Sequence, residues 1–146
     1  MITKIRHTGI VVRNLEKAVK FYEALGFKIS SRQVETGSFI DQVVGIKNVK
    51  VETAKFIAPC SGMLELLQYH SHPVEEEFSK QHSNKLGCSH IALQVEELSE
   101  TLLVVEKLGG TTPRLPATTS DKQYTVVYCH DPEGNIIEIV KKSKTP

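Results

Sequence analysis

The sequence contains no tryptophan, only three cysteines and no long hydrophobic run. No stretch approaches the roughly 20 consecutive apolar residues that a membrane-spanning helix needs. The N-terminal residues MITKIRHTGI lack the long apolar core of a secretory signal peptide. The cysteine count is odd and no CxxC pair occurs, which argues against a disulfide framework and favours reduced thiols. We therefore expect a cytoplasmic protein that has no membrane partner.

Positive charge is also not concentrated anywhere along the chain. The formal net charge is +1 over 146 residues, and the longest like-charge runs are Glu75-Glu76-Glu77 and Lys141-Lys142. Neither run forms the basic stripe that a nucleic-acid-binding protein presents, so we expect no nucleic-acid partner. The length and the 40% apolar content suit a single domain over residues 1–146.

The chain repeats itself over a long internal period. A shift of 83 positions places residues 7–26 on residues 90–109. His7 then meets His90, and a leucine-glycine pair ends both segments. Because such a repeat reflects a duplicated structural unit, each half is expected to fold in the same way.

A second shift, of 73 positions, relates the ends of the two halves. Residues 58–67 fall on residues 131–140, and Glu65 meets Glu138. The difference between the two shifts gives the first half about ten additional residues. They fall around 30–50, where two glycines suggest loops.

Each half predicts a strand, a helix and then about three strands. The spacing of apolar residues predicts helices over 15–25 and 98–108, with Asn14 as an N-cap and glycines 26 and 109 just past the ends. We expect a first module over about 1–70, a polar linker over about 71–87 and a second module over about 88–146. The strands expected from alternation and turn signals cover 5–12, 49–58, 62–69, 88–95, 123–130 and 135–141.

The alternation of strand residues predicts where the histidines face. The residues on the opposite face from His7 and His90 are more uniformly apolar and should lie under the helices, so the histidines should face the concave side. Glu65 and Glu138 each lie mid-strand between aliphatic residues, where an unpartnered carboxylate is costly. A single strand histidine is usually structural and a single strand glutamate usually faces water, but here the arrangement occurs twice. We therefore expect a site for one divalent ion, with Zn, Ni, Co, Mn and Fe(II) all suited to these ligands.

The segments HTGIVVRNLEKAVKFYEALGFK, LELLQY, SHIALQV and DPEGNIIEIV together resemble the vicinal-oxygen-chelate superfamily, which includes glyoxalase I, methylmalonyl-CoA epimerase, extradiol dioxygenases and bleomycin-resistance proteins. The resemblance implies an α+β fold of two βαβββ modules that form an eight-stranded, incompletely closed barrel. It implies metal ligation by His7, Glu65, His90 and Glu138. It also implies a homodimer, with the site built by one chain or shared between two.

The four-ligand set looks most like glyoxalase I and the epimerase. It implies a metal-dependent lyase or isomerase that removes a proton next to a carbonyl of a small molecule through a stabilised enolate or enediolate. Glu138 or Glu65 would be the base, with Glu138 favoured by analogy; the alternative is that both glutamates stay bound to the metal and water mediates the proton transfer. Val11 stands where glyoxalase I has an arginine that helps bind glutathione, which argues against that carrier. An Fe(II)-dependent dioxygenase and a non-catalytic small-molecule-binding protein are the alternatives.

Residues beyond the ligands are expected to shape the substrate site. The segment 35–50 has no clear counterpart in glyoxalase I and is expected to help select the substrate. Gln94 is a candidate to line the cleft. Arg32, Arg114 and Tyr124 are candidates to meet an anionic substrate.

Overall fold

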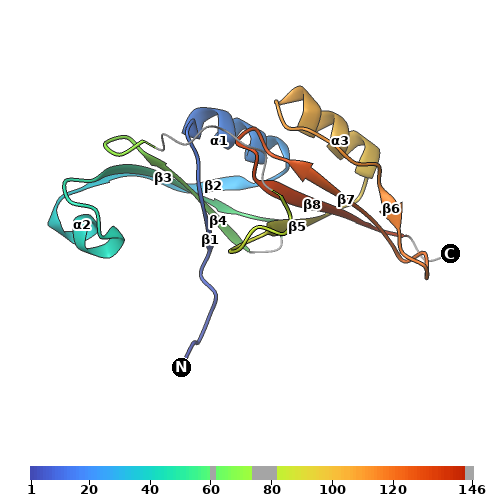
Figure 1. The fold of residues 1–146 in the computed structure, drawn as a ribbon, viewed down its shortest axis with the longest axis horizontal. Coiled ribbons are helices and arrows are strands. Elements are labelled where there is room, and N and C mark those ends of the chain that lie inside the picture. The colour runs from blue at the N-terminus through green and yellow to red at the C-terminus, as the bar shows by residue number, and fades with distance from the viewer. Residues whose placement is uncertain (60–61, 74–81, 144–146) are drawn as a thin grey trace. The chain divides into compact units, whose positions relative to one another are not determined.

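The chain forms two compact units, Met1–Glu76 and Glu77–Pro146. The computed structural model describes residues 1–59, 62–73 and 82–143. Within these residues the eight strands fall into two four-stranded sheets, one in each unit. Each unit follows the order strand, helix and three strands, with one additional short helix in the first unit (Figure 1). The predicted α+β class with two βαβββ modules is confirmed.

The first unit builds its sheet from strands that are far apart in the chain. Its elements are β1 (Thr8–Val11), α1 (Leu15–Ala24), β2 (Lys28–Thr36), α2 (Ser38–Val44), β3 (Lys50–Ile57) and β4 (Met63–Tyr69). The sheet order is β1-β4-β3-β2, with β1 parallel to β4 and the other pairs antiparallel. The parallel pair places the segment after His7 directly beside the strand that carries Glu65.

One face of this sheet is covered by α1. The predicted N-cap is confirmed, because the Asn14 side chain accepts a hydrogen bond from the Lys17 amide. Gly26 follows the helix with a φ of 95°, a left-handed conformation in which glycine is favoured. The fully buried side chains at this face come from the helix and the two central strands: Leu15, Ala18, Phe21, Tyr22, Ala54, Phe56 and Leu66.

The sequence did not predict α2, which lies within the region expected to form loops. Gly37 and Gly45 bound this short helix, and both adopt positive φ angles. Ile40 of α2 packs in a buried cluster with Val49 and Val51, against the partly buried Tyr69. The additional residues of the first half therefore fold back onto the sheet face opposite α1.

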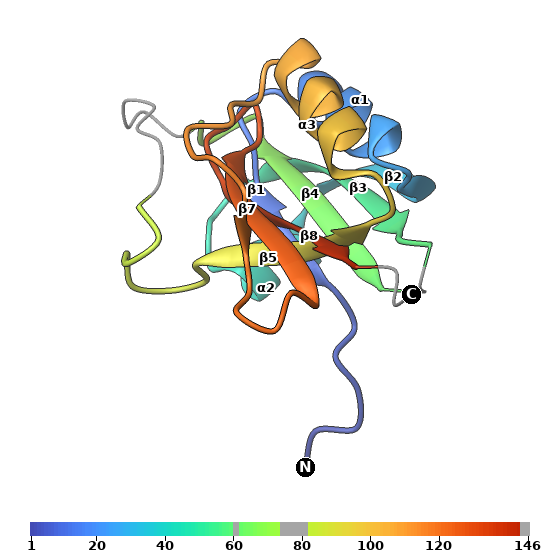
Figure 2. The ribbon, with the colours of Figure 1, turned by 90° about the vertical axis from the view of Figure 1, so that its right-hand side faces the viewer.

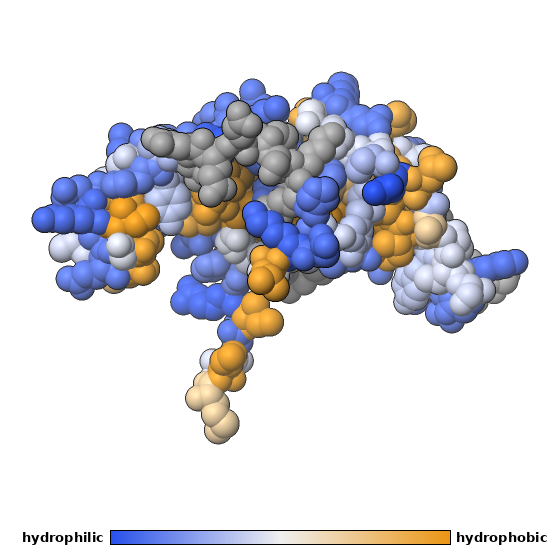
Figure 3. All heavy atoms as spheres, viewed as in Figure 1, coloured by the Kyte–Doolittle hydropathy of each residue, from blue (hydrophilic) through white to orange (hydrophobic). Residues whose placement is uncertain are grey.

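The first strand is shorter than predicted, because β1 begins at Thr8 and not at residue 5. Thr8 pairs with Leu64, so any residue before His7 would extend past the start of β4 at Met63. Without a partner strand, residues 1–7 have no regular structure. These residues project from the unit as an extended segment in which Figure 3 shows hydrophobic and hydrophilic colours mixed. Ile2 and Ile5 of this segment are exposed.

The second unit repeats this order of elements, but the strand at one edge of its sheet is much shorter. Its elements are β5 (His90–Val95), α3 (Leu98–Lys107), β6 (Ala117–Thr118), β7 (Tyr124–His130) and β8 (Ile136–Lys142), in the sheet order β5-β8-β7-β6. The predicted helix and both strands of the predicted hairpin are present within two residues of their expected ends. The counterpart of β2 is only the two-residue β6.

The helix α3 covers one face of the second sheet, as Figure 2 shows. Leu98 and Val105 of α3 are buried, as are Val127, Cys129, Ile137 and Ile139 of the sheet. His90, Ala92 and Gln94 lie on the other face, because strand residues alternate. The predicted separation of an apolar helix-covered face from a histidine-bearing face therefore holds in this unit.

Residues 74–81 of the predicted linker over 71–87 lie outside the described residues, so the linker is described only over 71–73 and 82–87. The cysteines differ in their exposure. Cys129 is buried, but Cys88 is exposed, and Cys60 lies outside the described residues. No described helix is long and apolar enough to cross a membrane.

Candidate metal centre

Two of the predicted ligands form a close pair in the first unit. His7 Nε2 lies 2.9 Å from Glu65 Oε2. His7 immediately precedes β1, while Glu65 lies at the centre of β4 and is only 8% exposed. The strand register explains the pair, because Gly9 lies opposite Glu65 and leaves space above the strand beside His7.

The other two predicted ligands form an equivalent pair in the second unit. His90 Nε2 lies 2.8 Å from Glu138 Oε2. His90 begins β5, and Ala92 lies opposite Glu138 in the parallel register of β5 with β8. The second pair thus repeats the strand order, the register and the pairing atoms of the first.

The position opposite each glutamate on the neighbouring antiparallel strand differs between the units. Lys55 of β3 lies opposite Glu65, and its Nζ is 3.3 Å from Glu65 Oε1. Tyr128 of β7 lies opposite Glu138 and packs on His90, with ring centroids 4.9 Å apart. One glutamate therefore faces an ammonium group and the other faces a phenol ring.

The second histidine is also held through its other ring nitrogen. His90 Nδ1 lies 3.2 Å from Ser89 Oγ and 3.4 Å from Tyr128 Oη. Metal-ligating histidines commonly form a hydrogen bond through the ring nitrogen that does not bind the metal, which fixes the orientation of the ring. The Nε2 atom of His90 is thereby directed toward Glu138.

The donor atoms fit a divalent cation. Each pair supplies one imidazole nitrogen and one carboxylate oxygen, a set that suits Zn, Mn, Fe, Co or Ni. Glu65 is buried and already lies 3.3 Å from the Lys55 ammonium group, so a cation at this pair would share the carboxylate with Lys55. Among the described residues, neither unit gathers three or more histidine, cysteine or acidic side chains into a metal-binding group of its own. Each unit therefore holds one histidine–glutamate pair.

Sequence reasoning missed Lys55 and Tyr128. The same shift of 73 that relates Glu65 to Glu138 also relates these two residues, so the repeat could have identified them as equivalent. Their contact with the glutamates depends on the register of each hairpin, which gives Lys55↔Glu65 and Tyr128↔Glu138. No feature of the residues themselves indicated that contact.

Arg32, a candidate for contact with an anionic substrate, is already engaged by carboxylates. Its guanidinium pairs with Glu16 at 2.5 Å and with Glu52 at 2.7 Å. Glu52 also lies 2.9 Å from His70 Nε2. Hydrogen bonds from His70 and then Arg32 hold the pKa of Glu52 below its ordinary value. Arg32 therefore joins α1 to the edge of the sheet instead of facing Glu65.

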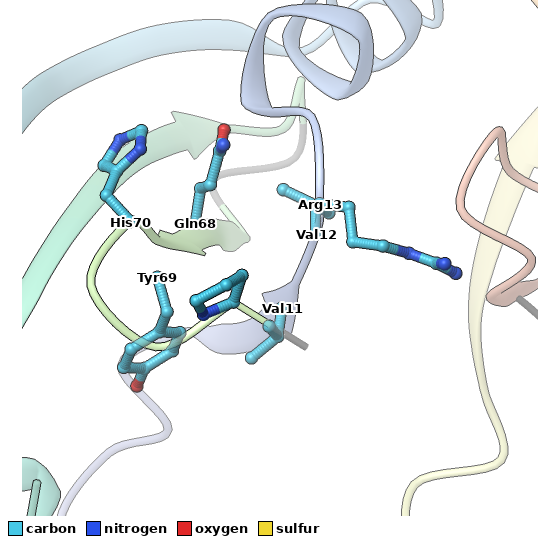
Figure 4. A pocket seen from close by; sticks show the side chains of 7 residues that line it. Val11, Val12, Arg13, Gln68, Tyr69 and His70 are labelled. Atoms are coloured by element: carbon cyan, nitrogen blue, oxygen red, sulfur yellow. The ribbon is translucent and has the colours of Figure 1, made fainter. Parts of the chain in front are cut away.

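A cavity of about 300 Å³ lies at the end of β1 and β4 in the first unit. Figure 4 shows Val11, Tyr69 and His70 around it, with the Gln68 side chain directed toward α1 and Arg13 directed away from His70. The polar groups are already engaged, since Gln68 Oε1 accepts from the Leu15 amide and His70 contacts Glu52. Tyr69 is four residues beyond Glu65, a separation of about 13 Å along a strand. The cavity therefore extends away from the His7–Glu65 pair, although its lining residue Val11 lies opposite Leu67, two residues from Glu65.

Comparison with known proteins identifies the family. The sequence model of the glyoxalase/bleomycin resistance protein/dioxygenase superfamily matches residues 4–139. The chain belongs to this superfamily. An uncharacterized Bacillus subtilis protein, YwbC, is 28% identical over 144 residues, covering 97% of this chain and 100% of YwbC.

Solved structures of superfamily members share the fold. A glyoxalase family protein from Bacillus cereus is 22% identical, with a TM-score of 0.90 and coverage of 99% of this chain and 97% of the other. The fosfomycin resistance protein FosX from Listeria monocytogenes, solved with Mn(II) and sulfate, is 13% identical. Its TM-score is 0.65, with coverage of 98% of this chain and 95% of FosX. The superfamily thus includes a protein whose structure contains a divalent cation.

Proposed function

We propose that this protein is a divalent-metal-dependent lyase or isomerase that removes a proton next to a carbonyl group of a small molecule. The observation that carries the proposal is the repeated pair, with His7 Nε2 2.9 Å from Glu65 Oε2 and His90 Nε2 2.8 Å from Glu138 Oε2. Duplication of one structural unit explains why the register repeats, but the position opposite each glutamate has diverged to Lys55 and Tyr128 while the histidine and the glutamate occur in both halves. A shared requirement for the same donor atoms accounts for their presence in both halves.

The proposal assigns both pairs to one cation, so that His7, Glu65, His90 and Glu138 are its four protein ligands. The four donors come from one chain or from the two chains of a homodimer. A bound divalent cation would polarise a carbonyl oxygen and favour negative charge on it. Mn(II) in FosX supports a divalent cation, and Zn, Ni, Co and Fe suit the same donors.

Glu138 is the proposed base and Glu65 the carboxylate that stays in place. Glu65 is held from two sides, by His7 and by the ammonium group of Lys55. Among the described residues Glu138 has no lysine or arginine partner, and its side chain is more exposed, at 21% against 11% for Glu65. A carboxylate with fewer fixed contacts is better able to reach a proton of the substrate and then hold it. The smaller number of fixed contacts to Glu138 therefore supports its assignment as the base.

The experiment measures how fast the substrate proton next to the carbonyl exchanges with solvent. Metal-loaded protein in deuterated water is incubated with hemithioacetals and acyl-CoA thioesters, and deuterium incorporation is measured by mass spectrometry. Wild type should catalyse incorporation into one of these classes. Glu138→Gln should retain the metal but lose about 100-fold or more of the exchange rate. Glu100→Gln, at an exposed position in the first turn of α3, is the matched control and should exchange like wild type.

Three results would contradict the proposal. Exchange at the wild-type rate in Glu138→Gln would remove the role of this residue. Oxygen consumption with catechols in place of proton exchange would indicate a dioxygenase. Purified protein that holds no metal after supplementation but binds a small molecule tightly would indicate a binding protein.

A further inference from the structure

A cavity of about 260 Å³ opens in the second unit beside the His90–Glu138 pair. Tyr128 and His130 of β7 line it together with Ile136 of β8. Register places Ile136 opposite both His130 and His90. Because residues opposite one another in a sheet share a face, the cavity lies on the same face as His90 and Glu138.

Tyr128 forms a wall between the cavity and the metal-binding pair. Its ring packs on His90 at 4.9 Å between centroids, and its hydroxyl lies 3.4 Å from His90 Nδ1. It also lies directly opposite Glu138 on the neighbouring strand. A molecule that occupies both positions must therefore pass around the Tyr128 side chain.

The polar groups around the cavity are all able to donate hydrogen bonds. Arg114 carries a permanent positive charge, and imidazole and hydroxyl groups come from His82, Ser83, Tyr128 and His130. None of the described lining residues is acidic. Arg114 is exposed and has no carboxylate partner among the residues that the structure describes. Arg32, by contrast, is neutralised by two carboxylates.

We propose that this cavity binds an oxyanion of the substrate, through Arg114, while the carbonyl end of the same molecule lies at the His90–Glu138 pair. This inference rests on the proposed function and narrows its substrate class to small carbonyl compounds that carry a carboxylate, phosphonate or phosphate. The guanidinium group suits such groups because its parallel N–H donors match two oxygens of an oxyanion. Arg114 lies near the carbonyl end of the substrate. It would therefore bind a charged group of the substrate itself and not a carrier group, such as glutathione, attached to it.

Binding of small probes tests the proposal without turnover. Pyruvate, acetylphosphonate and the neutral pyruvamide, which are too short to span both positions and so report on the oxyanion site alone, are titrated into metal-loaded and metal-free protein by isothermal calorimetry. The two anions should bind at least about tenfold more tightly than the amide, the change expected for one charge-assisted hydrogen bond. Tighter binding of pyruvate than of acetylphosphonate would identify a carboxylate as the preferred group, and the reverse would identify a phosphonate or phosphate. The preference should persist without metal, because Arg114 is not a metal ligand.

Two variants separate the arginine that faces the cavity from one that does not. Arg114→Gln should abolish the preference for anions, while Arg32→Gln should retain it. Equal binding of pyruvate and pyruvamide by the wild type, or an unchanged preference in Arg114→Gln, would overturn the proposal.

The failure of this inference can be distinguished from failure of the proposed reaction. If Glu138→Gln loses proton exchange but Arg114→Gln binds anions like wild type, the reaction stands and the oxyanion site is wrong. If the anion preference requires Arg114 but no probe exchanges a proton, the oxyanion site stands and the reaction is wrong.

Discussion

Replacement of Gly110 by alanine should strongly destabilise the second unit. Gly110 lies between the end of α3 and the bridge of Thr111 with His130. An added Cβ would lie 2.5 Å from the His130 carbonyl oxygen, 2.8 Å from Val105 Cγ1 and 2.9 Å from the Val105 carbonyl oxygen. The first distance is 0.9 Å short of the 3.4 Å at which ordinary contact begins. Two of the three obstacles are backbone atoms, which cannot move by changing a rotamer.

The expected loss of stability follows from the atoms that the added methyl group would displace. The His130 carbonyl accepts a hydrogen bond from the Thr111 amide at 3.0 Å, and Val105 is fully buried. Overpacking of this kind costs about 1–3 kcal/mol, and rigid backbone contacts place the substitution at the upper end. Alanine also restricts the unfolded chain, which offsets about 0.4–1 kcal/mol. We expect a net loss of about 2 kcal/mol and a fall in Tm of roughly 6 °C.

The assay is chemical denaturation followed by circular dichroism, with Gly62→Ala as the matched control. The nearest atom to an added Cβ at Gly62 is Ala58 Cβ at an ordinary 3.9 Å. That variant should therefore be as stable as wild type or more stable by up to about 1 kcal/mol. Equal stability of Gly110→Ala and wild type would refute the close approach of residue 110 to the His130 carbonyl.

Three further predictions concern the rest of the molecule. Asn14→Ala removes the acceptor for the Lys17 amide and should lower the free energy of unfolding by about 1 kcal/mol in urea denaturation. Burial raises the pKa of the Cys129 thiol to about 11, so mass spectrometry should find Cys129 unmodified by alkylating reagent until the protein is unfolded. Because His70 and Arg32 lower the pKa of Glu52, its ionised form stabilises the fold at neutral pH. The stability advantage of wild type over Glu52→Gln should therefore shrink as the pH falls through that lowered pKa, and a constant difference would contradict the assignment.

The repeated order of strands and helices could be predicted because local sequence patterns indicate each element. Apolar spacing located α1 and α3, and Asn14, Gly26 and Gly109 marked helix ends through the chemistry of single residues. The alternation of β5 correctly assigned His90 to the face away from the helix. Comparison of the halves placed Glu65 and Glu138 at equivalent positions, which the two parallel registers confirm.

The remaining features depend on contacts between distant residues. The seven residues of α2 are stabilised by packing of Ile40 on Val51, which no local pattern revealed. The start of β1 is set by where β4 begins. Lys55 and Tyr128 acquire their places beside the glutamates only through hairpin register, and the sequence could not assign different surroundings to the two carboxylates.

The ratio of bound metal to protein tests most directly whether the two pairs bind one cation. Wild type, His7→Ala and His90→Ala are loaded with Mn(II), dialysed and analysed for metal and protein. If both pairs bind one shared cation, wild type should hold one ion per chain, and either variant should lose nearly all tightly bound metal. Two ions per chain in wild type, with one retained in each variant, would show that the pairs act independently and would contradict the shared centre.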